Sequence, residues 1–274
     1  MTLHPEVDEE RETSWATVPA LEGCSVTVVI PTRNEAPNIE PLVTRLGSAL
    51  AGTFPRWEAV FVDDSEDATP QVVRGLHELG FPLRLVHREP GARPGGLGGA
   101  VVAGFGVASG EVIVVMDADL QHPPEVVPDL VAPVLAGEAA LVAGSRYVWG
   151  GGAAGLDGPW RHLVSRSCRA LVHVLLPPSR ALQDPMSGFF ALRRSFVDGA
   201  VLRPEGYKIL LEVAVRARPD RVSNVGFTFA PRHAGSSKAT LRQGLVFFKH
   251  LSRLVTAGHS EAATEGAEGK PVRR

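Results

Sequence analysis

Cysteine is scarce in this sequence, with only Cys24 and Cys168 among 274 residues and no CxxC spacing. Two isolated thiols supply neither a disulfide framework nor the paired spacing of a zinc site. We therefore interpret both as ordinary thiols of a protein that works in a reducing compartment.

An excess of charge of either sign is also missing, because 28 Lys and Arg residues face 30 Asp and Glu residues and the formal net charge is −2. A chain without an overall positive field does not attract nucleic acid, so we expect no nucleic-acid partner. Any anionic ligand must instead be bound by local clusters of Arg and Lys.

Long apolar runs are absent as well. The runs at residues 26–30, 112–116 and 171–176 fall well short of the ~18–20 residues that cross a bilayer. Residues 1–22 are acidic and contain no basic-then-apolar segment, so we expect no signal peptide. These absences predict a cytoplasmic protein, and they leave open whether it rests on a membrane surface.

Composition divides the chain into three parts. Residues 1–22 are acidic and aperiodic and are predicted to be a disordered lead-in, whereas residues 257–274 are polar and Gly-rich and are predicted to be a flexible tail. Between them, residues 23–256 show no linker and no internal repeat, which suits one large domain. We divide this domain into a first half, residues 23–145, and a second half, residues 146–256.

The first half alternates short apolar strands with helical segments. Strands are predicted at residues 25–30, 57–62, 83–87, 111–116 and 139–143, and helices at residues 39–50, 70–79, 99–108 and 124–135. In the second half, helices are predicted at residues 160–176 and 241–255, and strands at residues 189–193 and 222–230. Nearly all-apolar strands that alternate with helices favour a mostly parallel α/β sheet covered by helices on both faces.

Acidic residues stand where two of the predicted strands end, with Asp63 and Asp64 after the second and Asp117 and Asp119 after the fourth. Ligands of open α/β sheets bind beyond the carboxyl ends of the strands. We therefore expect these acids to meet, together with the loop at residues 31–35, in one crevice.

The spacing of Asp117, Asp119 and Gln121 indicates a metal site, because residues two apart at the end of a strand project to the same side. Carboxylate and amide oxygens are hard ligands that suit Mg²⁺ or Mn²⁺ and not zinc. Such an ion would neutralise charge on a departing diphosphate. The plainer alternative is that the two aspartates cap a turn, but their place between an apolar strand and a helix start favours the metal site.

Five stretches taken together resemble a known enzyme family. They are VDDS at 62–65, DADLQHPPE at 117–125, DPMSGFF at 184–190, GYKILLE at 206–212 and RHAGSSK at 232–238. The set is similar to the inverting, nucleotide-sugar-dependent glycosyltransferases with a GT-A fold, and within them to the polyprenol (dolichyl) monophosphate mannose synthases. No single motif is specific, but the combination is, and the similarity covers about residues 25–255.

The resemblance implies a nucleotide-sugar site in the first half of the domain. The residues that it assigns there are Pro31, Arg33, Glu35, Asp63, Asp117, Asp119 and Gln121. Asp63 would contact the base or the ribose, and the last three would hold the metal and the donor diphosphate. Arg33 stands where many relatives carry Tyr.

The second half is expected to bind the acceptor. A phosphate acceptor needs no general base, because its second pKa lies near ~6 and it already carries an oxyanion near neutral pH. It must approach an anionic diphosphate, however, and this requires local cations. The resemblance implies acceptor-phosphate binding by Arg146, Arg161, Ser165 and Arg232, and Lys238 lies in the same group of motifs; Asp119, Lys208 and Arg146 are the implied catalytic residues.

Two helices of the second half deserve separate expectations. Arg161 and Ser165, four residues apart, share one face of the predicted helix 160–176, whereas Arg166 and Arg169 are expected to be solvated surface charges. Both this helix and the helix at 241–255 are candidates for docking on a membrane surface. The second has a composition that suits an interfacial helix, because basic residues flank an apolar stripe of Leu241, Leu245, Phe248, Leu251 and Val255. For the second helix, packing on the protein core explains the apolar stripe equally well.

The implied reaction is inverting transfer of a sugar, mannose from GDP-mannose, onto a polyprenyl monophosphate at the cytoplasmic face of a membrane, with Mg²⁺ or Mn²⁺ as cofactor. The resemblance also leaves room for a membrane-spanning partner protein. A UDP-sugar donor, such as UDP-glucose, is the main alternative, because the metal motif does not separate the two donors.

Other functions are disfavoured by what the chain lacks or retains. A processive polysaccharide synthase would carry a Gln-x-x-Arg-Trp motif and membrane spans, and the sequence shows neither. A non-catalytic nucleotide-sugar-binding protein would not need the intact metal and acceptor motifs. The Gly-rich residues 95–99 do not spell GxGxxG, so a dinucleotide site is not expected, and we interpret them as a tight turn into a helix.

Overall fold

The computed structural model describes residues 25–152, 159–204, 206–234, 244 and 246–256, and of residues 159–164 only the helical backbone. The predicted lead-in and tail lie outside the described residues, as do Lys238 and the side chain of Arg161. Those four expectations therefore stay predictions.

One sheet of seven strands carries the fold, in the order β3-β2-β1-β4-β6-β5-β7. The strands are β1 (Val26–Thr32), β2 (Trp57–Asp63), β3 (Leu83–His87), β4 (Val112–Val115), β5 (Leu141–Ser145), β6 (Phe190–Arg193) and β7 (Val222–Gly226). Every neighbouring pair is parallel except the pairs of β6, which runs antiparallel to both β4 and β5. The expected mostly parallel α/β sheet is confirmed.

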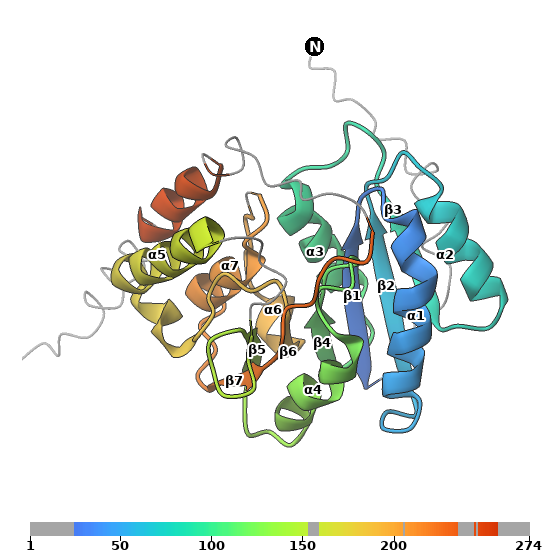
Figure 1. The fold of residues 1–274 in the computed structure, drawn as a ribbon, viewed down its shortest axis with the longest axis horizontal. Helices are drawn as coiled ribbons and strands as arrows, with labels where there is room; N and C mark the ends of the chain where they lie inside the picture. The colour runs from blue at the N-terminus through green and yellow to red at the C-terminus, as the bar shows by residue number, and fades with distance from the viewer. Residues whose placement is uncertain (1–24, 153–158, 205, 235–243, 245, 257–274) are drawn as a thin grey trace, which may run out of the picture.

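Helices cover both faces of this sheet (Figure 1). They are α1 (Ala36–Leu50), α2 (Thr69–Glu78), α3 (Gly96–Val107), η1 (Pro124–Val126), α4 (Val127–Leu135), α5 (Pro159–Leu175), η2 (Pro177–Ala181), α6 (Ser195–Asp198) and α7 (Ile209–Arg216), and residues 246–256 are also helical. Each βα connection in the first half returns the chain to a parallel strand, which brings the carboxyl ends of β1, β2 and β4 to one edge.

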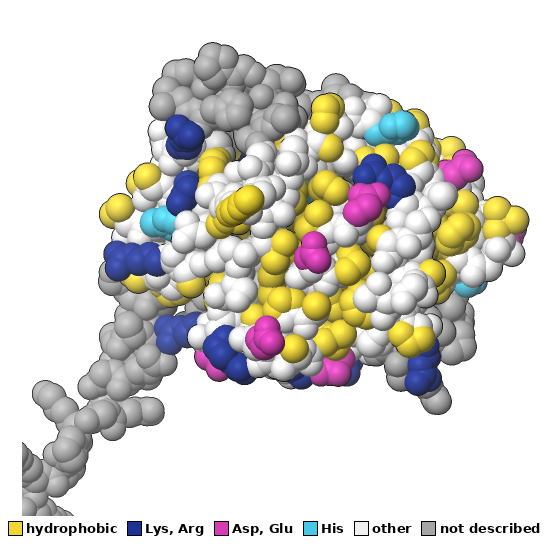
Figure 2. Space-filling model, turned by 60° about the horizontal axis from the view of Figure 1, so that its bottom comes forward, with side chains coloured by type: hydrophobic (Ala, Val, Ile, Leu, Met, Phe, Trp, Pro, Cys, Tyr) yellow, Lys and Arg dark blue, Asp and Glu magenta, His cyan; other side chains and the backbone are white. Residues whose placement is uncertain are grey.

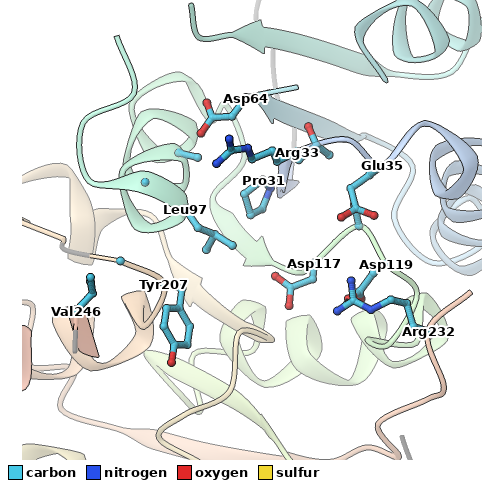
Figure 3. Close-up of a pocket in the computed structure, with 15 residues that line it drawn as sticks. Pro31, Arg33, Glu35, Asp64, Leu97, Asp117, Asp119, Tyr207, Arg232 and Val246 are labelled. Carbon is cyan, nitrogen blue, oxygen red and sulfur yellow. The ribbon is translucent and has the colours of Figure 1, made fainter. Parts of the chain in front are cut away.

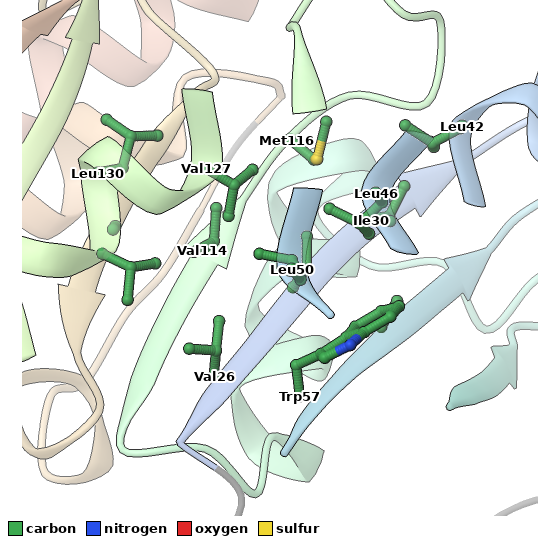
Figure 4. Packing of buried hydrophobic residues seen from close by; sticks show 14 of the residues in the cluster. Val26, Ile30, Leu42, Leu46, Leu50, Trp57, Val114, Met116, Val127 and Leu130 are labelled. Carbon is green, nitrogen blue, oxygen red and sulfur yellow. The ribbon is translucent and has the colours of Figure 1, made fainter. Parts of the chain in front are cut away.

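Alternate residues of the strands supply two separate cores, because successive side chains of a strand point to opposite faces. Val26, Val28 and Ile30 of β1 pack with α1 and α4 in the cluster drawn in Figure 4. Val29 of the same strand packs on the other face with residues of α3 and α7. A fully buried Val or Leu contributes about 1.5–3 kcal/mol relative to an exposed one, so the cores on both faces stabilise the sheet.

A third core joins α5, α7 and the helical residues 246–256 at one end of the molecule. Phe247, Leu251 and Leu254 of the last helix are buried there, whereas 53% of Phe248 is exposed. Within the described residues, this helix therefore packs on the core with one face. His250 fixes the contact further, because its Nε2 lies 2.8 Å from a carboxylate oxygen of the buried Glu212 in α7.

The predicted elements were right in kind for the first half and less complete for the second. The predicted strand 222–230 ends at Gly226, and the predicted helix 124–135 is a 3-10 turn, η1, followed by α4. η2, α6 and α7 were not predicted. Residues 209–215 of α7 are buried on every side, so this helix lacks the alternation of polar and apolar faces that reveals a surface helix.

Candidate active site

A cavity of about 680 Å³ opens at the carboxyl edge of the sheet (Figure 3). Its lining residues come from the loops after β1, β2 and β4, the start of α3, and the segments around residues 206, 232 and 246. They are Pro31, Thr32, Arg33, Glu35, Asp64, Gly96, Leu97, Ala100, Asp117, Ala118, Asp119, Gly206, Tyr207, Arg232 and Val246. The loops expected to meet in one crevice do meet there.

Six residues assigned to the site from the sequence line this cavity. They are Pro31, Arg33, Glu35, Asp117, Asp119 and Arg232. Figure 3 shows Asp117, Asp119 and Arg232 at one end of the cavity and Asp64 and Arg33 at the other. A bound ligand would place its charged part near Asp117, Asp119 and Arg232 and its opposite end near Asp64 and Arg33.

Asp63 lies beneath the cavity and not in its wall, which corrects the expected direct contact with the base or ribose. Its carboxylate is fully buried and accepts hydrogen bonds from Thr32 Oγ1 at 2.8 Å and from His87 Nδ1 at 2.7 Å. Asp64 lines the cavity instead. Successive residues at a strand end point to opposite sides, and the sequence did not tell which of the two adjacent aspartates faces the ligand.

Asp117 and Asp119 form an acidic pair in the cavity. Desolvation within the cavity raises the pKa of Asp117, although 39% of its side chain is exposed. Burial, and next the neighbouring charge of Asp117, raise the pKa of Asp119. Desolvation and mutual repulsion thus destabilise the charged forms of both carboxylates. A cation bound between them would stabilise those charged forms.

Arg232 partly supplies that positive charge. Its Nη2 lies 2.8 Å from Asp119 Oδ2 and donates a hydrogen bond of 3.1 Å to Gln121 Oε1. Gln121 is buried and does not line the cavity, and its own amide donates to the carbonyl of Ala230. The segment that carries Arg232 is thus bound to the loop that carries Asp119, although the two are far apart in the sequence.

His122 holds the acidic loop without adding a charge to it. Its Nδ1 accepts a hydrogen bond of 3.0 Å from the backbone N–H of Asp117, and its ring stacks on Phe189 with 5.0 Å between centroids. Burial lowers the pKa of His122 to about 4, so the ring is neutral near pH 7 and Nδ1 is free of a proton. The role of His122 was not predicted, although it belongs to the motif at 117–125.

Arg146 lies outside the cavity wall. Its guanidinium donates two hydrogen bonds to Asp184, from Nε at 2.7 Å and from Nη2 at 3.0 Å, and Asp184 is fully buried. A buried carboxylate thus already partners the guanidinium, and the phosphate contact expected of Arg146 stays a prediction. Asp184, from the DPMSGFF motif, was not expected to have this role.

Lys208 interacts electrostatically with the Arg146–Asp184 pair and with Asp117. Its Nζ donates a hydrogen bond of 2.6 Å to the carbonyl of Met186. Burial and the charge of Arg146 lower its pKa to about 8, against the opposing effects of Asp184 and Asp117. Lys208 therefore remains mostly protonated at pH 7 and brings a cation close to Asp117.

Ser165 and its neighbours on α5 lie next to Tyr147. A hydrogen bond of 2.7 Å joins the Ser165 and Tyr147 hydroxyls, and either can be the donor. Arg169 lies over the Tyr147 ring, 4.9 Å from its centroid, and donates to Gln183, so it is half-buried and partnered where a solvated charge was expected. Arg166 is exposed, as expected.

The residues present fit a divalent cation that is shared with a ligand. Among the described residues, no group of three His, Cys, Asp or Glu side chains could hold a metal ion by itself. Asp117 and Asp119 both face the cavity, however, and one or two carboxylates plus substrate phosphates are the usual ligands of Mg²⁺. Gln121 does not line the cavity, and its amide oxygen accepts a hydrogen bond from Arg232, so its expected place as the third ligand stays a prediction.

Comparisons with known proteins agree with this geometry. The family model for glycosyl transferase family 2 matches residues 27–198. The chain is 41% identical to a dolichol-phosphate mannosyltransferase of Pyrococcus furiosus over 231 residues, which are 84% of this chain and 63% of that protein. It is 35% identical to the dolichol-phosphate mannosyltransferase of Saccharomyces cerevisiae, with 83% and 85% of the two chains covered.

Solved structures show the same fold. Glucosyl-3-phosphoglycerate synthase from Mycobacterium tuberculosis, in complex with Mn²⁺, UDP-glucose and phosphoglyceric acid, superposes with a TM-score of 0.64 at 23% identity, covering 86% of this chain and 80% of that one. Mannosyl-3-phosphoglycerate synthase from Rubrobacter xylanophilus gives a TM-score of 0.64 at 20% identity, covering 84% and 74%. The expected GT-A fold is thereby confirmed, and the family match over most of the domain shows that this chain belongs to glycosyl transferase family 2.

Proposed function

We propose that this protein transfers mannose from GDP-mannose, with inversion, onto a polyprenyl monophosphate of the dolichyl type. One observation carries the proposal: the acidic pair Asp117 and Asp119 shares one cavity with the cation Arg232, whose Nη2 lies 2.8 Å from Asp119 Oδ2. The names of the similar proteins, which are dolichol-phosphate mannosyltransferases, support the acceptor and the sugar. The chain spans 63% of the length of the Pyrococcus furiosus relative.

The charges of the site match two anionic substrates. The donor diphosphate would lie at Asp117 and Asp119, where Mg²⁺ or Mn²⁺, when bound, would neutralise charge on the leaving group. The Mn²⁺ complex of the mycobacterial glucosyl-3-phosphoglycerate synthase supports this choice of metal. Arg33 and Glu35 would then hold the nucleoside part of the donor, because they line the cavity further along the loop after β1.

The acceptor side would provide cations in place of a base. The acceptor phosphate is already ionised near neutral pH, so it can attack the anomeric carbon directly from the side opposite to the diphosphate. Lys208 and Arg232 would orient its oxygens and offset the repulsion between the two anions. Arg146 would act on the phosphate through Lys208 and Arg232, or directly once its ion pair with Asp184 is broken. Ser165, Arg161 and Lys238 would complete the phosphate-binding group.

A lipid acceptor requires contact with a membrane surface, and we expect it at the end of the molecule that carries α5, on the cytoplasmic side. No helix within the described residues is long and apolar enough to span a bilayer. Figure 2 shows basic and hydrophobic side chains gathered at its left, which is the α5 end in Figure 1. That mixture suits an interfacial helix, and a membrane-spanning partner protein would be an additional anchor.

The decisive experiment tests donor and acceptor together. Purified protein is given GDP-mannose or UDP-glucose with a polyprenyl phosphate and Mn²⁺, and the anomeric configuration of the lipid product is determined by NMR. We expect β-linked mannosyl phosphate from the α-linked donor. Transfer from UDP-glucose alone would overturn the proposed donor, and binding of the donor without any transfer would favour a non-catalytic nucleotide-sugar-binding protein.

The acidic pair is tested in the same assay with Asp119→Asn, which keeps the shape of the side chain and removes its charge. We expect transfer to fall by about 100-fold or more, because the variant loses electrostatic stabilisation of the leaving diphosphate. Asp129→Asn on the exposed face of α4 is the control and should leave the rate unchanged. Near-normal turnover by Asp119→Asn would overturn the assignment of the metal and diphosphate site.

A further inference from the structure

Arg88, which directly follows β3, has a buried guanidinium in which all three nitrogens donate. Nε donates to Asp64 Oδ1 at 2.8 Å, and Nη2 donates to Asp64 Oδ2 at 2.5 Å and to the carbonyl of Gly96 at 2.9 Å. Nη1 donates to the carbonyl of Pro94 at 3.3 Å. Only 8% of the side chain is exposed, so solvent cannot replace these bonds.

The backbone of Arg88 takes part in the same connection. Its N–H donates to the carbonyl of Asp63 at 2.8 Å, and its own carbonyl accepts from Arg93 Nε at 2.9 Å. One residue thus joins the end of β2, the end of β3 and the Gly-rich turn that opens α3. Arg88 itself does not line the cavity and has no role in the proposed reaction described above.

The groups that Arg88 holds are walls of the cavity. Asp64 and Gly96 both line it, and Asp64 lies at the end of the cavity away from the acidic pair (Figure 3). The start of α3 also reaches the acceptor side, because the N–H of Gly98 donates to the carbonyl of Gly206 at 2.7 Å. The start of α3 is thus held from two sides, by Arg88 and by the backbone at Gly206.

The turn has little freedom to adjust without Arg88. Gly95 has a φ of +73°, which L side chains rarely adopt. A Cβ on Gly99 would lie 1.8 Å from the carbonyl oxygen of Pro94 and 3.2 Å from Arg88 Nη1. The backbone and the guanidinium are packed directly against each other, and Arg88 donates to the carbonyls on both sides of Gly95, those of Pro94 and Gly96.

We propose that Arg88 is a positioning residue for the nucleotide sugar: it fixes Asp64 and the start of α3 as the two walls that receive the nucleoside end of the donor. The inference rests on the proposed use of the cavity by a nucleoside diphosphate sugar. It assigns to Arg88 an effect on donor affinity and not on the chemistry, because the acidic pair and Lys208 are held by other contacts.

The experiment measures the dissociation constants of GDP and UDP by calorimetry in Mn²⁺, and KM and kcat for the donor, with Arg88→Met and Arg88→Lys. Loss of the clamp should raise the dissociation constant of the preferred nucleotide and the KM by about 10-fold or more, equal to about 1.4 kcal/mol. The kcat at saturating donor should change by less than about 3-fold. Arg88→Lys keeps the charge, but one ammonium group cannot reproduce a fork that bonds a carboxylate and two carbonyls, so we expect it to behave like Arg88→Met.

The chain offers a matched control in Arg84, at the opposite end of β3. Its side chain is 12% exposed and likewise bridges a buried carboxylate, Glu58, and a backbone carbonyl, that of Val107, far from the cavity. Arg84→Met should lower the melting temperature as Arg88→Met does. It should leave nucleotide affinity within about 2-fold, because neither group that Arg84 holds lines the cavity.

The outcomes separate this inference from the proposed function. Unchanged nucleotide affinity in Arg88→Met, wild-type affinity in Arg88→Lys, or an equal loss in Arg84→Met would each overturn the positioning role while leaving the function intact. A wild-type protein that binds neither GDP nor UDP would overturn the proposed function itself, and the inference with it. If only one of Arg88→Met and Arg88→Lys folds, the nucleotide affinity of that variant alone decides whether Arg88 positions the donor.

Discussion

Lys208 is the residue whose charge most directly links the structure to a measurable pH dependence. Its amine is buried near Arg146, which lowers its pKa from the usual 10.5 to about 8. Below this value the ammonium is present and can bind an anionic acceptor, and above it the charge is lost. For folding the sign is the reverse: the native state binds fewer protons than the unfolded chain between about pH 8 and 10.5, so this group favours the native state more as pH rises through that window.

We expect the transfer rate to fall as pH rises through about 8, with the fall displaced upward in Lys208→Arg, because a guanidinium keeps its charge throughout. The measurement is a profile of kcat/KM for the polyprenyl phosphate between pH 6 and 10 at fixed metal and donor. Lys208→Met should be slow at every pH and show no such fall. Superimposable profiles for the wild type and Lys208→Arg would show that another group titrates.

Asp63 and Asp64 show where residue-level reading from the sequence was insufficient. The pair was found, because acids that follow an apolar strand are conspicuous, but its two members were not distinguished. In the structure, Asp63 completes a buried hydrogen-bond network and Asp64 faces the cavity. The difference depends on the direction of each side chain at the last residues of β2, which neighbouring loops determine.

At the scale of elements, the packing of α3 on the sheet depends on a glycine. A Cβ on Gly104 would lie 2.3 Å from Val29 Cγ1 and 3.2 Å from Val62 Cγ2, so α3 can approach β1 and β2 this closely only without a side chain there. Two residues along the same helix, a Cβ on Gly106 would meet nothing within 4 Å. The two glycines are thus a matched pair with different surroundings.

Gly104→Ala should lower the free energy of unfolding by about 1–3 kcal/mol, because an extra methyl group forces the helix away from the sheet. Gly106→Ala should raise it by about 0.5–1 kcal/mol, because alanine has the higher helix propensity and the site has room. Urea denaturation of the two variants and the wild type measures both effects. Equal destabilisation by both changes would contradict the close packing of α3 at Gly104.

The helices of the second half illustrate which elements a sequence pattern reveals. The helix predicted at 160–176 corresponds to α5. It could be predicted because a surface helix has one polar and one apolar face, which gives a periodic pattern in the sequence. α7 has no polar face and was missed. The last helix was predicted with two alternatives, a membrane surface or the protein core. In the structure Phe247, Leu251 and Leu254 pack inward, whereas 53% of Phe248 is exposed.

For the whole molecule, the distribution of charge matters more than the net charge of −2. Residues 159–183 contain four Arg and no Asp or Glu. On the same element, 70% of Val174 and 37% of Leu175 are exposed. An overall nearly neutral protein thus presents a basic and apolar end to its surroundings, as peripheral membrane helices do.

We expect sedimentation with vesicles of phosphatidylcholine and phosphatidylglycerol, weaker sedimentation with phosphatidylcholine alone, and a loss of binding when salt rises from 50 to 500 mM, because salt screens surface charges over about 10 Å at 0.1 M. Val174→Ser should weaken binding, whereas Val201→Ser, at a position 66% exposed elsewhere on the surface, should not. Equal binding to both vesicle types at all salt concentrations would contradict this orientation.

The sequence by itself determined the order of strands and helices in the first half, the α/β class and the acids at the strand ends, because these follow from local periodicity and from motifs that are contiguous in the chain. Only the tertiary structure decided which of these residues share a cavity. Arg232 contacts Asp119 and Gln121, which precede it by more than a hundred residues. Arg146 pairs with Asp184, and Arg88 bonds to both Asp64 and the start of α3. Such partnerships depend on the distances between elements and on which buried charge finds which counter-charge, and no local pattern in the sequence encodes either.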